Sequence, residues 1–125
     1  EFDESSKAIE LARILAIKNN NSYITTYSNV FLIKLKILKL ATKGYNDEIE
    51  ECITSLKKMI RGVSGLEEKA LICFELWELN RKLFGLDRYY EKYRIRSIKI
   101  YKALYRKTPQ FEFSHRINAL SKTNN

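Results

Sequence analysis

The sequence contains very few residues that interrupt helices or cross-link a chain. Among its 125 residues there are one proline, four glycines and two cysteines. Proline and glycine are the poorest helix formers, so their scarcity predicts long helices. The two cysteines lack the CxxC spacing of metal and redox centres. Two isolated thiols predict a reducing, cytoplasmic environment and no disulfide framework.

A long hydrophobic run is also missing. The longest one, VFLIKLKILKLA at residues 30–41, contains three lysines. It is far shorter than the ~20 apolar residues that a membrane-spanning helix needs. We therefore expect no membrane association.

Residues that carry common enzyme chemistry are scarce as well. His115 is the single histidine and has no cysteine near it in sequence, so it cannot join a metal-ligand cluster of the usual spacing. Neither a GxSxG nucleophile motif nor a glycine-rich phosphate loop occurs. The arginine that helical ribonucleases place shortly before their histidine is absent, because Thr108, Pro109 and Gln110 stand there. We expect no catalytic residue, no metal, no cofactor and no enzymatic activity.

What the sequence does contain is a strong local charge. Residues 88–107 (RYYEKYRIRSIKIYKALYRK) hold eight basic residues and one acid, so this segment supplies seven of the eight net positive charges of the chain. It also holds five of the eight tyrosines. A positive segment of this kind attracts phosphates or an acidic protein.

Apolar residues spaced by three and four, separated by helix stop signals, predict six helices and an all-α fold. Gly44 is placed to end a helix in a left-handed conformation, and Gly85 is placed to end another helix. Ser64 with Glu67 resembles a capping box, and Thr108 followed by Pro109 predicts an N-cap with proline at the first helical position. The expected helices are 3–18, 23–43, 47–62, 65–84, 87–107 and 109–120.

The first two expected helices differ in how their apolar residues are distributed. The second is apolar all round its axis, which predicts a position between two neighbouring helices. The alternation of apolar residues and lysines at 33–37 is typical of a strand, but the surrounding apolar segment without turn signals is too long for one. In the first helix we expect one apolar face, formed by Ala8, Ile9, Leu11, Ala12, Leu15 and Ala16.

Three segments resemble the tetratricopeptide repeat. KGYNDEIEECITSLKKMI at 43–60 and SKAIELARILAIKNNN at 6–21 are similar to the second helix of such a repeat, and Lys107-Thr108-Pro109 is similar to the end of one. The resemblance implies antiparallel helical hairpins stacked in a right-handed superhelix, with Ala8, Ala12 and Ala16 where helices approach closely. We expect residues 1–125 to form a single helical-repeat domain, a fragment of a larger protein, comprising 3–61, a second hairpin 64–107 and a closing helix 109–120.

The same resemblance implies a function. Repeats of this family bind peptides or protein segments in a concave groove and serve as scaffold or sensor parts of larger regulatory proteins. Here the groove would be lined by Lys34, Ile72, Glu75 and Leu79. We therefore predict a non-catalytic module that binds a protein or peptide.

The basic segment allows a second prediction. On a helix, its cations form one face, made of Arg88, Lys92, Arg96, Lys99, Lys102 and Arg106. The tyrosines lie on the other side, where we expect them in the core, whereas readers of single-stranded nucleic acid combine both on one surface. The face is then either solvated and balanced by acids of other helices, or a dock for an acidic protein or phosphate. Nucleic-acid binding through this face is the alternative function, and assembly with another copy is a third.

Overall fold

The computed structural model describes residues 2–44, 47–85 and 90–121. These residues form six helices and no strand, which confirms the predicted all-α class. In these residues, no helix has both the length and the hydropathy needed to cross a membrane. The helices are α1 (Phe2–Lys18), α2 (Ser22–Ala41), α3 (Asp47–Gly62), α4 (Leu66–Phe84), α5 (Glu91–Lys107) and α6 (Phe111–Ser121).

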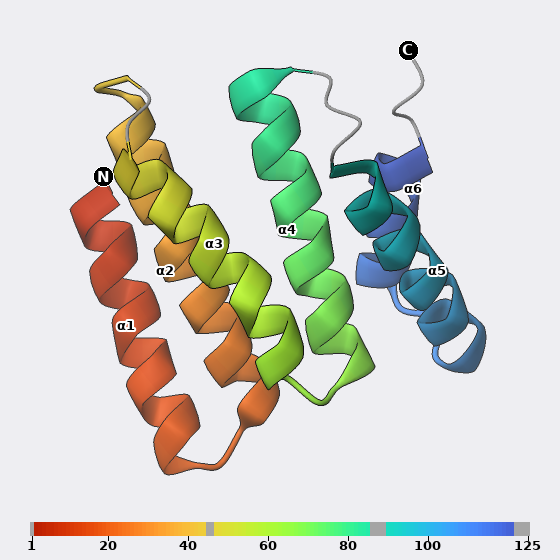
Figure 1. Ribbon diagram of the computed structural model, residues 1–125. Helices are drawn as coiled ribbons and strands as arrows, with labels where there is room; N and C mark the ends of the chain where they lie inside the picture. The colour runs from red at the N-terminus through yellow and green to blue at the C-terminus, as the bar shows by residue number, and fades with distance from the viewer. Residues whose placement is uncertain (1, 45–46, 86–89, 122–125) are drawn as a thin grey trace. The chain divides into compact units, whose positions relative to one another are not determined.

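The helices belong to two compact units, Glu1–Val63 and Ser64–Asn125. In the first unit α1 packs on α2 and α2 on α3, and in the second α4 packs on α5 and α5 on α6. Within each unit, successive helices run in opposite directions (Figure 1). Short connections explain this arrangement, because a helix that follows another after a few residues returns along it.

The core of the first unit follows the hydrophobic pattern of its two last helices. The helix α2 lies between α1 and α3, as its all-round apolar character predicts, and it buries Val30 and Ile37 completely. The helix α3 buries a single face, consisting of Ile49, Cys52, Ile53, Leu56 and Ile60. Each large aliphatic side chain removed from water in this way contributes about 1.5–3 kcal/mol.

The predicted apolar face of α1 is only partly buried. Ala16 is 5% exposed, but Leu11 and Leu15 are 60% and 51% exposed, and Ala8 and Ala12 are exposed as well. The prediction of one packed face, with close approach at all three alanines, is therefore wrong for this helix. The physical reason is that apolar residues cover more of the circumference of α1 than a single neighbour can bury, and α1 packs on α2 alone.

The second unit has α5 between α4 and α6. All side chains from Ala70 to Trp77 on α4 are buried. The fully buried Ser97 of α5 donates a hydrogen bond from Oγ to the Ala70 carbonyl oxygen, at 2.9 Å. On the α6 side, Tyr101 is 1% exposed, and its ring centroid lies 5.9 Å from that of Phe113.

Helix ends follow the predicted stop signals in part. Gly44 has a φ of +99°, which confirms the predicted positive φ at this helix end, and Gly85 ends α4 with φ +79° and ψ −143°. The turn before α2 ends at Asn21, whose Oδ1 accepts a hydrogen bond from the Ile24 N–H at 3.0 Å.

Two predicted helix starts are wrong by one or two residues. The N-cap of α4 is Gly65 and not Ser64, and Glu68 accepts from the Gly65 N–H at 3.2 Å. A Cβ at Gly65 would lie 2.7 Å from the Glu68 carboxylate, so glycine leaves room for this contact. Pro109 precedes α6 instead of opening it. The Gln110 carbonyl oxygen accepts the first helical hydrogen bond of α6, from the Ser114 N–H at 3.3 Å, so the helix begins after Gln110. The predicted start of the fifth helix at Asp87 lies outside the described residues.

Candidate functional site on the basic face of α5

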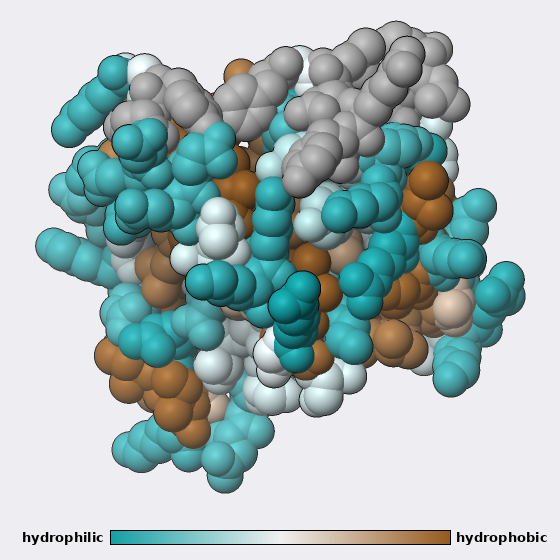
Figure 2. All heavy atoms as spheres, viewed as in Figure 1, coloured by the Kyte–Doolittle hydropathy of each residue, from teal (hydrophilic) through white to brown (hydrophobic). Residues whose placement is uncertain are grey.

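Five of the six predicted cations lie on one exposed face of α5. This basic stripe consists of Lys92, Arg96, Lys99, Lys102 and Arg106, all exposed. The spacing of three and four residues places them in a row, since such positions are neighbours on a helix. Figure 2 shows hydrophilic side chains over much of the visible side of α5. The sixth predicted cation, Arg88, lies outside the described residues.

The opposite face of α5 holds the helix in the core. Tyr93, Ser97 and Tyr101 are buried there, and Tyr90 just before the helix is buried as well. The predicted core position is confirmed for these three tyrosines. Tyr105 is 40% exposed, and Tyr89 is not among the described residues. Because the buried tyrosines face α4 and α6, the basic stripe on the other side of α5 points away from these two helices.

Two of the acids expected to balance the stripe pair with other cations. On α4, Glu75 pairs with Arg116 at 3.8 Å and Glu78 with Lys82 at 4.0 Å. The described parts of the chain contain no ion pair to Arg96, Lys99, Lys102 or Arg106. The Nζ of Lys92 lies 5.1 Å from the centre of the Tyr93 ring. The stripe is thus a row of solvent-facing positive charge.

An apolar side chain lies between these cations. Ile95 is 48% exposed, and it precedes Arg96 by one position and Lys99 by four. A partner that supplies carboxylates to the stripe would therefore also meet an aliphatic contact. Surfaces of this mixed kind are common at protein interfaces, where buried apolar atoms add to charge complementarity.

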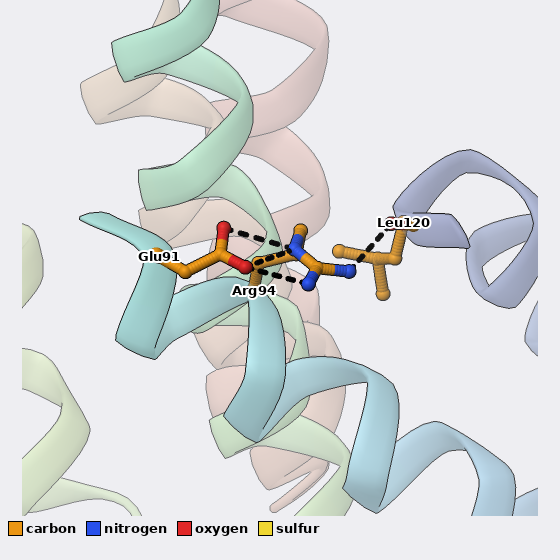
Figure 3. A network of polar contacts seen from close by, with 3 residues as sticks. All are labelled: Glu91, Arg94 and Leu120. Carbon is orange, nitrogen blue, oxygen red and sulfur yellow. Dashed lines mark hydrogen bonds and ion pairs between the residues drawn. The ribbon is translucent and has the colours of Figure 1, made fainter. Parts of the chain in front are cut away.

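Arg94 has a structural task and does not belong to the stripe. Its guanidinium binds the Glu91 carboxylate, with Nη2 to Oε2 at 2.6 Å, and it donates from Nη1 to the Leu120 carbonyl oxygen at 3.0 Å (Figure 3). The hydrogen bond from Arg94 lowers the pKa of the Glu91 carboxyl. The contact joins α5 to the last turn of α6, where a cation is favourable to the helix dipole.

The predicted groove residues have other surroundings. Ile72, Glu75 and Leu79 are 0%, 1% and 1% exposed, so they lie in the interior and a partner would reach them only after a rearrangement. Lys34 is half-buried, with Nζ 5.0 Å from the centre of the Phe31 ring. The structure does have a shallow hollow in the first unit, lined by Ser6, Lys7, Glu10, Leu11, Ile14 and Leu32.

Arg116 is the residue that sequence reasoning missed. From α6 it contacts Glu75 and lies 4.6 Å from the Phe74 ring centre, while Glu112 on its own helix is 3.4 Å away. Burial lowers the pKa of the guanidinium, but the electrostatic interactions with Tyr101, Glu75 and Glu112 together outweigh burial and raise the pKa above its usual value. A single arginine among apolar residues of the last helix was the only available signal. Arg116 joins α6 to α4 through a buried ion pair.

Groups that support catalysis or metal binding are buried or dispersed. In the part of the chain that the structure describes, no three potential ligands are grouped to hold a metal ion. Cys52 and Cys73 are free and buried, and burial raises the pKa of Cys73 to about 11, so its thiol stays protonated. His115 is exposed and stacks on Phe111. The buried carboxylates of Glu68 and Glu75, which the sequence did not predict as buried, serve a helix start and an ion pair.

Comparison with known proteins gives no relative: no family model, no curated protein and no solved structure matches the chain.

Proposed function

We propose that the chain is a non-catalytic interaction module that binds an acidic segment of a partner protein along the basic stripe of α5. The observation that carries this proposal is the row of exposed cations, four of which have no acid within the described residues. Cations without an acid to neutralise them keep their positive potential for an external ligand. The aromatic residues on the far side of α5 hold it in place.

Two features favour an acidic protein over a nucleic acid. Bases bind to proteins largely by stacking on aromatic rings, and Tyr90, Tyr93 and Tyr101 are too buried to offer such a surface. Ile95, by contrast, offers an aliphatic contact between cations, which suits a peptide that alternates acidic and apolar residues.

The wider architecture is part of the proposal. Antiparallel packing in chain order within each unit supports helical hairpins of the tetratricopeptide kind, which we propose to stack in a right-handed superhelix. Such a superhelix would serve as the scaffold or sensor part of a larger regulatory protein. Two free, buried thiols support a cytoplasmic location.

Nucleic-acid binding is the second candidate, and the concentration of charge favours it. Most of the net charge of +8 comes from the segment that contains the stripe. Contacts between several cations and phosphates would give an affinity that falls steeply with salt. The two candidates therefore differ in ligand class but use the same side chains.

A comparison of two probes separates the candidates. Fluorescence anisotropy would be measured with a labelled polyglutamate peptide and a labelled single-stranded oligonucleotide of the same charge, each at about 50 and 200 mM salt. We expect the peptide to bind more tightly than the oligonucleotide, with both affinities weaker at high salt. A tighter complex with the oligonucleotide would favour the second candidate, and no binding of either probe at low salt would remove both.

A further inference from the structure

The outward face of α1 carries an exposed apolar row. This row, the α1 seam, consists of Ala8, Leu11, Ala12 and Leu15. All four are exposed, Leu11 at 60% and Leu15 at 51%. Their spacing of three, four and seven residues is that of a helix face which packs against another helix. An apolar patch over the C-terminal half of α1 is visible at the lower left of Figure 2.

Nothing in the described part of the first unit covers the α1 seam. The more buried side of α1 contains Ile9 and Ala16 and is turned by about 100° from the seam. In the described part of its unit, α2 is the main neighbour of α1. Single exposed apolar side chains are common on protein surfaces. A contiguous row of them at the spacing of a helix-packing face is typical of an interaction site.

We infer that the α1 seam is a homodimer interface, in which α1 of a second copy lies antiparallel on it. The sizes of the four side chains fit this arrangement. With the two-fold axis between Leu11 and Ala12, Ala8 lies opposite the partner's Leu15, and Leu11 lies opposite the partner's Ala12. Each leucine thus meets a small residue, and small residues allow two helix axes to come close and the larger side chains to interdigitate.

The charges at the ends of the seam fit the same register. Glu4 and Lys18 are both exposed, lie within about 40° of each other on the helix, and have no ion pair in the described residues. In the antiparallel pair, Glu4 comes next to the partner's Lys18, and the two-fold symmetry repeats the contact at the other end. A parallel pair would instead bring like charges together at both ends.

This self-complementarity selects a second copy over a different partner. A surface that contains both members of each contact, small with large and acid with base, matches itself after a two-fold rotation, as isologous interfaces do. One helix from each copy forms a small interface, so we expect a dissociation constant of about 10–100 µM. The interface is separate from the basic stripe and does not depend on the proposed ligand of that stripe.

Sedimentation equilibrium of the full chain tests the inference. At about 200 µM the chain, of 14.8 kDa, is expected to be mainly dimeric. The Leu11→Asn/Leu15→Asn variant should be monomeric, with a helical circular dichroism spectrum like that of the wild type because both residues are half exposed. The control Ile17→Asn alters a residue that is 50% exposed but lies off the seam, and it should remain dimeric.

Charge exchange tests the register. Glu4→Lys alone should weaken the dimer at least threefold, and adding Lys18→Glu should restore the wild-type dissociation constant. A monomeric wild type at about 200 µM would overturn the inference. A dimer that tolerates the Leu11→Asn/Leu15→Asn change would do so as well, since the interface would then lie elsewhere. If Glu4→Lys abolishes the dimer and the added Lys18→Glu does not restore it, the antiparallel register is wrong.

Discussion

Replacing Arg116 with alanine is expected to destabilise the second unit by about 3 kcal/mol. The Arg116 and Glu75 side chains are 11% and 2% exposed, so the substitution would leave a buried carboxylate without its guanidinium. Removal of one member of a buried ion pair costs about 3–5 kcal/mol, and the 3.8 Å separation places this pair at the lower end. Alanine would also remove the contact with the Phe74 ring.

Urea unfolding followed by Trp77 fluorescence measures the effect, because Trp77 is the single tryptophan and lies in the same unit. As a matched control, Arg106→Ala removes an exposed arginine and should change the free energy of unfolding by less than about 0.5 kcal/mol. A double variant, Glu75→Leu/Arg116→Met, should recover much of the loss, since it removes both buried charges. If the Arg116→Ala and Arg106→Ala variants have the same free energy of unfolding, the ion pair between Arg116 and Glu75 does not stabilise the unit.

Reversal of two charges in the basic stripe is expected to weaken binding of polyglutamate by about thirtyfold or more. Lys99→Glu/Arg106→Glu removes two attractive charges and adds two repulsive ones, which together are worth about 2 kcal/mol at an exposed surface. Both side chains are solvent-facing, so folding should be unaffected. The measurement is fluorescence anisotropy at low salt, where screening is weakest.

The control for this change is Lys58→Glu/Arg61→Glu on α3. The two replaced cations are also exposed and lie in the other unit, and the double substitution changes the net charge by the same amount. If binding responds only to total charge, the two double variants will lose affinity equally. The stripe proposal requires that the α3 variant bind within about threefold of the wild type.

Sequence analysis predicted the helices and the basic stripe because both depend on local periodicity. Cations three and four residues apart on a helix share a face wherever that helix lies. The exposure of the basic stripe could therefore be predicted without knowing which helices lie next to α5. The tyrosines of α5 were placed in the core by the same geometry, and Tyr93 and Tyr101 are buried there.

Features that depend on which helices meet were not predictable in this way. Whether Ile72, Glu75 and Leu79 lie in a groove or in the interior depends on what packs against α4, and one sequence contains no information on that. The same holds for α1, where the sequence predicted one packed apolar face but could not show that its neighbour α2 leaves Leu11 and Leu15 exposed. The cap at Gly65 was missed because Glu68 and Glu67 are both acidic, so either one suits a capping box.

The most direct test of the proposed docking surface is a chemical-shift titration of the ¹⁵N-labelled chain with polyglutamate at about 50 mM salt. The account predicts that the largest backbone amide shifts fall in α5 between Lys92 and Arg106, and that α3 shifts little. Shifts centred on α1, α2 or α3, or no shifts at peptide concentrations up to about 1 mM, would contradict it.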